Sequence, residues 1–247
     1  MAEIDLPPSI RGLLFDMDGV LTDTARVHAQ AWKETFDDVL SRRPEAPGEN
    51  HAPFRLPEDY EAWVDGKPRE DGVRDFLRSR GITLPEGEPG DAPGDATVRA
   101  VGNAKNRRLL ELLRTKGVDV FPGSARFLHA ARDHGLQTAV VSSSANAEEA
   151  LRAAGILDQF DARVDGTVIA REHLRGKPAP DSFLRAAELL GLEPEAGAVF
   201  EDAQAGVQAG RAGGFGRVVG VDRGGNAEAL RAHGADVVVR DLAELLS

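Results

Sequence analysis

The sequence contains no cysteine, and this absence excludes several kinds of site at once. Without thiols the chain cannot form disulfides, zinc–thiolate sites or iron–sulfur clusters, and it cannot use a cysteine nucleophile. A chain without cysteine also fits a reducing compartment, so we expect a cytoplasmic protein.

The sequence also lacks blocks of basic residues and long apolar runs. Lys and Arg number 30 against 41 Asp and Glu, which gives a formal net charge of −11. Nucleic acids and anionic membrane surfaces both need a basic patch, so we expect neither as a partner. No apolar run approaches the roughly 20 residues that cross a bilayer. The first ten residues are acidic and Pro-rich, unlike a secretory signal.

Short apolar runs that end at polar residues predict the strands of a parallel sheet. The predicted strands are Gly12–Phe15, Gln137–Val141, Ala162–Val164, Ala198–Phe200, Arg217–Val221 and Asp236–Val239. Helical spacing fills the gaps between the later strands, and repeated βα units form a sheet covered on both faces. The predicted fold is therefore α/β, with a Rossmann-like parallel sheet.

The segment after the first strand shows helical rather than strand-like spacing of its apolar residues. Helical spacing predicts helices over 25–40, 56–64, 71–80 and 105–116, and two Pro/Gly-rich loops separate them at 42–57 and 86–97. We predict an α/β core formed by residues 1–24 and 118–247, with a small α-helical domain inserted at 25–117. No apolar stripe suggests an oligomer, so we expect a monomer.

Ligands of open α/β sheets bind beyond the carboxyl ends of the strands, which directs attention to the first predicted strand. Asp16 and Asp18 follow that strand, two residues apart. An Asp there can attack phosphorus and carry it covalently, and a second one can donate and accept the proton. The alternative is an ordinary turn in which Gly19 supplies an unusual backbone angle.

A second acidic pair, Glu201 and Asp202, ends the apolar run 198–200. This pair could simply be a solvated turn that opens the next helix. Two acidic pairs at two strand ends would nevertheless repel each other unless a cation lay between them. Oxygen ligands suit Mg²⁺, which also binds substrate phosphates.

Polar residues follow two further strands. Ser142, Ser144 and Asn146 come after the second strand, where they could bind phosphate oxygens or simply cap the next helix, since Asn146 and Glu149 fit a capping box. Lys177 lies in a Pro-stiffened loop, where it is either a surface lysine or the partner of the nucleophile carboxylate.

Taken in order, these segments resemble the four motifs of the haloacid dehalogenase superfamily of phosphotransferases. They are Asp16-Met-Asp-Gly-Val-Leu-Thr-Asp, a Ser after the second strand, Gly-Lys177-Pro-Ala-Pro-Asp and Glu201-Asp202-Ala-Gln-Ala-Gly. The resemblance spans the whole core, and the helical insertion resembles the small α-helical cap of that superfamily.

The chain is most similar to the β-phosphoglucomutase-like subfamily. The similarity includes Thr24, His28 and Trp32 after the first motif, the run Asp65-Gly66-Lys-Pro-Arg69, and Lys105. On its own, His28 reads as a surface histidine and Trp32 as core packing. The resemblance implies that a small phosphorylated sugar is bound by Thr24, His28, Trp32, Gly66, Arg69, Lys105, Ser144 and Asn146, with Arg69 holding its distal phosphate.

The resemblance also implies the roles of the core residues. Asp16 would be the nucleophile and a metal ligand, and Asp18 the acid/base that gives its carbonyl to the metal. Glu201 and Asp202 would complete a Mg²⁺ site, and Ser142, Asn146 and Lys177 would hold the transferring phosphoryl group.

The activity implied is the interconversion of β-glucose 1-phosphate and glucose 6-phosphate, through an aspartyl-phosphate and a bisphosphate intermediate. One alternative is a sugar-phosphate phosphatase that releases the same aspartyl-phosphate to water. Another is a phosphosugar-binding protein with an inactive site, although the presence of Asp16, Asp18, Lys177 and Asp202 argues against it.

Overall fold

The computed structural model describes residues 3–44, 46–64, 67 and 69–247. The chain divides into two compact units. The first, which we call the core unit, runs up to Thr24 and resumes over Gly117–Ser247. The second, which we call the cap unit, is Ala25–Lys116.

The core unit is built on a six-stranded sheet with the order β3-β2-β1-β4-β5-β6, in which every neighbouring pair is parallel. The strands are β1 (Gly12–Phe15), β2 (Gln137–Val141), β3 (Ala162–Val164), β4 (Gly197–Glu201), β5 (Arg217–Val221) and β6 (Val237–Val239). The predicted α/β fold with a Rossmann-like parallel sheet is confirmed.

Strand β1 lies in the middle of the sheet, and its register decides which residues meet at the strand ends. Leu14 is paired with Ala139 of β2 and Val199 of β4. All four residues of β1 are buried, because a central strand covered on both faces needs apolar side chains on each side.

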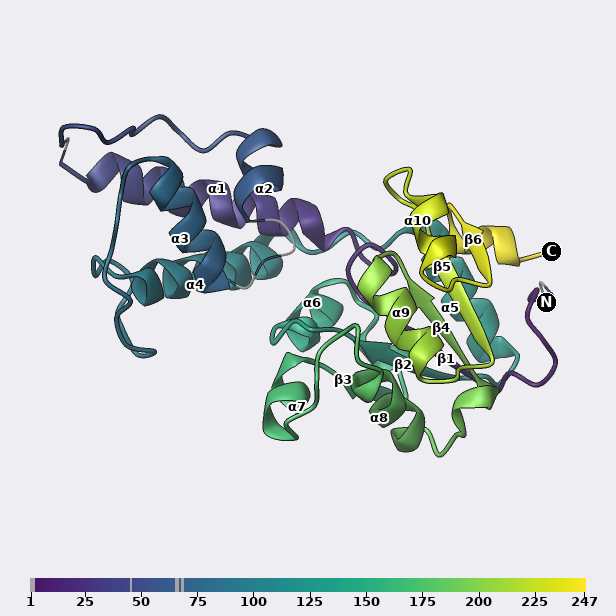
Figure 1. Ribbon diagram of the computed structural model, residues 1–247. Coiled ribbons are helices and arrows are strands. Elements are labelled where there is room, and N and C mark those ends of the chain that lie inside the picture. Colours follow the sequence, from purple (N-terminus) through teal and green to yellow (C-terminus); the bar gives the residue numbers. More distant parts are fainter. Residues whose placement is uncertain (1–2, 45, 65–66, 68) are drawn as a thin grey trace. The chain divides into compact units, whose positions relative to one another are not determined.

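Helices cover both faces of the sheet (Figure 1). Neighbours α8 and α9, then α9 and α10, are in contact along one face, and α5 packs with η3 on the other. The helical segments are α5 (Pro122–Asp133), α6 (Ala147–Ala153), η1 (Leu157–Gln159), α7 (Gly166–Arg171), α8 (Asp181–Leu189), η2 (Pro194–Ala196), α9 (Gln204–Ala212), α10 (Ala227–Ala232) and η3 (Leu242–Leu245). Helix α7 was not predicted, because its six residues are too few to show a helical period.

The cap unit is helical throughout its described regular structure. Its helices are α1 (Thr24–Arg42), α2 (Glu58–Trp63), α3 (Arg69–Ser79) and α4 (Val98–Lys116). The prediction that the last helix starts at Lys105 was wrong, because α4 begins two turns earlier at Val98, where Gly102 interrupts the apolar spacing. Aromatic rings form the interior, with Phe36 and Phe76 4.1 Å apart between centroids.

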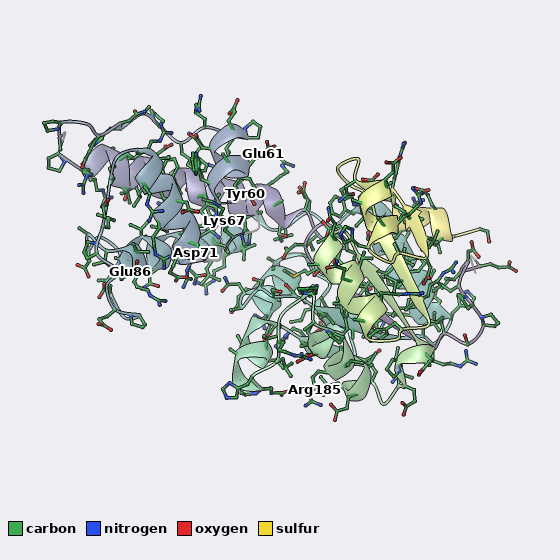
Figure 2. All side chains as sticks on the ribbon, in the orientation of Figure 1. Tyr60, Glu61, Lys67, Asp71, Glu86 and Arg185 are labelled. Atoms are coloured by element: carbon green, nitrogen blue, oxygen red, sulfur yellow. The ribbon has the colours of Figure 1, made fainter. Side chains whose placement is uncertain are left out.

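The two Pro/Gly-rich loops are held to the helices by specific contacts. Phe54, in the first loop, is fully buried, and its backbone is fixed by Asp37, which accepts from its N–H at 2.7 Å, and by Lys33, which donates to its carbonyl at 2.8 Å. At the start of the second loop, Arg74 of α3 bonds both Asp71 and Glu86, two of the residues labelled in Figure 2. No helix in the described parts of the chain is long and apolar enough to cross a membrane.

Candidate active site

The candidate site begins where β1, β2 and β4 end side by side. Asp16 directly follows β1, and its N–H continues the ladder by donating to Phe200 of β4 at 2.9 Å. Glu201 is the last residue of β4. Ser142 follows β2, and its N–H donates to Val164 of β3 at 3.0 Å. The parallel register therefore brings residues far apart in sequence to one edge of the sheet.

Lys177 joins two of these carboxylates. Its ammonium nitrogen lies 2.5 Å from Asp16 Oδ1 and 2.5 Å from Glu201 Oε1, and the Lys177 side chain is only 11% exposed. The ring of Phe183 in α8 lies below it, with the nitrogen 4.9 Å from the centroid. Burial alone would lower the pKa of Lys177, but the charges of Asp16 and Glu201 raise it, so this lysine stays protonated.

The Asp16 carboxyl is in an unusual electrostatic setting. Burial raises its pKa well above the ordinary value, the Lys177 charge opposes that shift, and the carboxylates of Glu201, Asp202 and Asp18 reinforce it. Burial and the charge of Glu201 also raise the pKa of Asp202, to about 7. Each carboxylate added at this edge makes the next harder to ionise, so the site calls for positive charge beyond Lys177.

Two glycines allow the loops of the site to approach closely. Gly19 has a φ of +81°, and a Cβ there would lie 1.9 Å from Asp202 Oδ2. A Cβ on Gly206 of α9 would lie 1.7 Å from Glu201 Oε1. Glu201 also accepts a 3.0 Å bond from the N–H of Ala203, so its carboxylate is fixed from three directions.

Asp18 is oriented by the first residue of α1. The hydroxyl of Thr24 donates to Asp18 Oδ1, and Thr24 is 1% exposed. Between them the chain turns back on itself, since the N–H groups of Leu21 and Thr22 both donate to the Met17 carbonyl at 3.0 Å. The predicted substrate residue Thr24 therefore contacts the predicted acid/base.

The loop after β2 is ordered by its own hydroxyls. Ser142 Oγ accepts from the N–H of Ser144 at 3.1 Å, and Ser144 Oγ accepts from the N–H of Asn146 at 3.1 Å. Asn146 occupies the N-cap position of α6, but its side chain makes no cap hydrogen bond. The capping box considered from the sequence is therefore not formed, because Ser144 supplies the acceptor for the Asn146 backbone.

The four predicted metal ligands, Asp16, Asp18, Glu201 and Asp202, lie near one another, since the charges of the other three raise the pKa of Asp16. Across residues 3–44, 46–64, 67 and 69–247, no three His, Asp or Glu side chains come together as a metal-binding group. The Lys177 ammonium lies between Asp16 and Glu201 and contacts both. The assignment of Asp16, Asp18, Glu201 and Asp202 to a metal stays a prediction.

In the cap unit, three of the predicted substrate residues form a cluster. Lys105 of α4 is 5% exposed, its nitrogen is 3.2 Å from His28 Nδ1, and it lies 5.1 Å from the centroid of the Trp32 ring. Burial and the charge of Lys105 lower the pKa of His28 to about 3, so this histidine is neutral. Trp32 itself stacks on Phe36 inside the cap unit, which agrees with the packing interpretation of its sequence.

The other predicted cap residues are not part of this described cluster. Arg69 starts α3 and bonds Glu70 at 3.0 Å, and its side chain is 36% exposed. Gly66 lies outside the described residues. The cap unit also has a cavity of about 440 Å³, to which both Pro/Gly-rich loops contribute. Arg42, which lines it, bonds Asp38, and Arg108 bonds Glu34 and Glu111, so these charges are already neutralised within the unit.

Two residues near the core site were missed in the sequence. Asn226 Nδ2 donates to the Asp202 carbonyl at 3.3 Å, and Arg223 Nε donates to the Gly19 carbonyl at 3.0 Å. Both lie in the loop between β5 and α10. Because this loop follows a parallel strand at the same edge of the sheet as Asp16, its residues could have been considered from the sequence.

Comparisons with known proteins agree with this geometry. The model of the haloacid dehalogenase-like hydrolase family matches residues 10–214. The β-phosphoglucomutase of Mycobacterium bovis is 57% identical over 247 residues, which cover 98% of this chain and 94% of that protein. The fructose-1-phosphate phosphatase YqaB of Escherichia coli is 32% identical over 208 residues, or 83% of this chain and 93% of that one.

Among solved structures, CbbY from Rhodobacter sphaeroides in complex with phosphate superposes with a TM-score of 0.70 at 26% identity, and the match covers 96% of each chain. The family-model match spans most of this chain, and the first relative is similar along nearly its whole length. The chain therefore belongs to the haloacid dehalogenase superfamily, in its β-phosphoglucomutase-like subfamily, and it is an enzyme.

Proposed function

We propose that this enzyme is a phosphosugar mutase that interconverts β-glucose 1-phosphate and glucose 6-phosphate. The observation that carries the proposal is the buried Asp16 carboxylate at the end of β1, paired with Lys177 at 2.5 Å and followed two residues later by Asp18. The Mycobacterium bovis relative, named β-phosphoglucomutase, supports the choice of substrate.

The proposed cycle starts with a phosphoryl group on Asp16. A hydroxyl of the bound sugar monophosphate attacks that phosphorus while Asp18 accepts the hydroxyl proton, and the bond between Asp16 oxygen and phosphorus breaks. The product is a sugar bisphosphate. After the sugar reorients, Asp16 attacks its other phosphate, Asp18 returns the proton to the departing oxygen, and the isomeric monophosphate leaves.

The polar groups at the strand ends would hold the transferring group. Lys177 is protonated and rigidly placed, so its charge is available to phosphoryl oxygens without reorganisation. Ser142 and Asn146 stand at the ends of a loop ordered by hydroxyl–amide bonds. We propose that they bind the remaining phosphoryl oxygens.

The core residues also fit a Mg²⁺ ion. Burial raises the pKa of the Asp16 and Asp202 carboxyls, and a divalent cation would allow both to ionise. Asp16, Asp202 and the backbone carbonyl of Asp18 would hold it. When bound, Mg²⁺ supplies positive charge that neutralises the phosphoryl oxygens.

The cap unit would supply the second half of substrate recognition. A mutase must keep a bisphosphate bound while it turns, so it needs a separate anchor for the phosphate that is not reacting. Arg69 has the planar, forked guanidinium that matches phosphate oxygens. Lys105 is kept in place by the neutral His28 and the face of Trp32, and we propose that it also contacts the sugar phosphate.

The same chemistry could end in hydrolysis. YqaB, a fructose-1-phosphate phosphatase similar over most of this chain, keeps that second candidate open. In a phosphatase, water rather than a sugar hydroxyl would attack the phosphoryl group on Asp16.

Product analysis separates the two candidates. The enzyme is incubated with β-glucose 1-phosphate, Mg²⁺ and a trace of glucose 1,6-bisphosphate, and glucose 6-phosphate and free phosphate are measured in parallel. We expect glucose 6-phosphate to exceed free phosphate. Free phosphate without glucose 6-phosphate would reject the mutase in favour of the phosphatase. Unchanged activity in Asp16→Ala would reject both.

A further inference from the structure

The turn that carries Asp18 has two backbone carbonyls that accept no backbone hydrogen bond from the described residues. The carbonyls of Met17, Leu21 and Thr22 accept from N–H groups of the turn or of Phe121. Within the part of the chain that the structure describes, those of Gly19 and Val20 accept no such backbone bond, although Val20 is fully buried. A buried carbonyl without a donor is costly, so another group must satisfy the carbonyl of Val20.

Arg223, in the loop after β5, supplies that group. Its Nε donates to the Gly19 carbonyl at 3.0 Å, and its Nη2 lies 3.4 Å from the Val20 carbonyl. Ser124 of α5 completes the arrangement with a 2.6 Å bond to the same Val20 oxygen. The turn is therefore held from outside by the loop after β5.

The guanidinium of Arg223 is itself immobilised. It stacks on the ring of Phe121 at 3.8 Å from the centroid, and its Nη1 donates to the Arg240 carbonyl at 2.9 Å and to Asp241 at 3.3 Å. All three nitrogens are thus in use, in the planar fork that only arginine has. A lysine would offer the charge but neither the fork nor the stack.

The same loop also reaches the second acidic pair. The Asp222 carboxylate accepts from the N–H groups of Gly225 at 2.6 Å and Asn226 at 2.8 Å, which fixes the loop. Asn226 then donates to the Asp202 carbonyl at 3.3 Å. One loop, which contributes no proposed catalytic residue, therefore contacts the backbone of both the Asp18 turn and Asp202.

We infer that Arg223 is a positioning residue for phosphoryl transfer, one that sets the place of Asp18 through the carbonyls of Gly19 and Val20. This inference rests on the proposed function, because it takes Asp18 as the acid/base. Displacing a reacting group by about 1 Å costs on the order of 10²-fold in rate, so the fixed turn has a direct kinetic consequence.

The test compares Arg223→Gln, Arg223→Lys and the control Arg231→Gln, which changes an exposed arginine on the following helix α10. We expect Arg223→Gln to lower kcat by about 10²-fold, with KM for β-glucose 1-phosphate within about threefold of wild type. Arg223→Lys should recover only part of the loss. Arg231→Gln should match wild type in both constants.

Hydrogen exchange provides a readout that does not depend on activity. In Arg223→Gln, the amides of Leu21 and Thr22 should exchange faster than in wild type, while amides of β4 and β5 keep their protection. That pattern would show a loosened turn in a folded core, and Arg231→Gln should leave it unchanged.

Three results would overturn the inference. A lower melting temperature with unchanged kcat per folded molecule would make Arg223 merely structural. Full activity in Arg223→Lys would mean that only the positive charge of Arg223 matters. Unaltered exchange at Leu21 and Thr22 would show that Arg223 does not hold the turn. Rates are scored on whichever product the wild type forms, so loss of the mutase proposal to the phosphatase leaves this test intact. If wild type forms neither product, the proposed function fails, and exchange decides whether Arg223 holds the turn.

Discussion

The two units each contain a buried lysine, and the two environments differ. Lys177 in the core unit lies between the carboxylates of Asp16 and Glu201, at 2.5 Å from each. Lys105 in the cap unit lies 3.2 Å from a neutral His28 and over the face of Trp32. The Lys177 ammonium is paired with two carboxylates, whereas the Lys105 ammonium contacts a neutral imidazole and an aromatic face.

This difference suggests a division of labour. A cation fixed by carboxylates is already in place before the substrate binds, which suits charge development during reaction. Lys105, which contacts His28 and the face of Trp32, is placed to recognise an arriving anion. Chemistry would then depend on the core lysine and substrate affinity on the cap lysine.

The largest effect is expected from the partner of Lys177. Asp16→Asn keeps the size of the side chain but removes the nucleophile, so turnover should fall to background and no phosphoenzyme should form. Labelling with a ³²P-bisphosphate, followed by gel analysis, measures the phosphoenzyme. Label retained in Asp16→Asn would show that another residue carries the phosphoryl group.

The next largest effect should come from Lys177 itself. Lys177→Met removes the charge from beside Asp16, and we expect kcat to fall by about 10²–10³-fold, the usual cost of a missing electrostatic donor. Steady-state kinetics, with circular dichroism to check the fold, would measure this. A change confined to KM would mean that Lys177 serves substrate affinity rather than the chemical step.

Lys105→Met should have a smaller effect of a different kind. Loss of a charged hydrogen bond to a phosphate raises KM by about tenfold or more, while kcat changes less. Arg114→Met, an exposed arginine near the end of the same helix α4, is the matched control. Equal losses of kcat in Lys105→Met and Lys177→Met would remove the division of labour.

The smallest effect is a pH dependence of stability in the core unit. Burial raises the pKa of Asp202 to about 7 from its ordinary 3.8, so between these values the metal-free folded protein binds a proton that the unfolded chain has lost. Stability from this group is therefore present at low pH and is lost as the pH rises through about 7.

Melting temperatures in EDTA from about pH 5 to pH 8 would measure this effect. Wild type should lose more stability over that range than Asp202→Asn, and Mg²⁺ should stabilise wild type more at the upper end of the range. Parallel curves for the two proteins would show that Asp202 does not titrate there.

The sequence was informative where chemistry and local pattern coincide. The residues at the strand ends follow short apolar runs, so β1 and Asp16 could be predicted together. The pairing of Lys177 with Asp16 could also be predicted, because several carboxylates close together at strand ends need a nearby positive charge. The inserted helical segment was predicted because helical spacing begins at residue 25, after the apolar run of the first strand.

The remainder depends on tertiary contacts that leave no local mark. Phe54 is the buried anchor of a Pro-rich loop, and nothing in that loop distinguishes it from an exposed aromatic residue. The contact of Glu201 with Lys177 was not predicted, since it depends on the distance between two loops. Arg223 lies in a Gly-rich loop, and its contact with Gly19 joins residues near opposite ends of the chain.

The insertion of the cap unit directly after β1 has a consequence for the order of folding. β1 is the central strand, yet its partners, with Gly12 paired to Gln137 and to Gly197, are synthesised only after the whole cap unit. Non-local pairing of this kind is slow, whereas helices that contact one another locally form quickly. We therefore expect the amides of the cap unit to be protected before those of β1 when the full chain refolds, and pulse-labelled hydrogen exchange during refolding would measure that order.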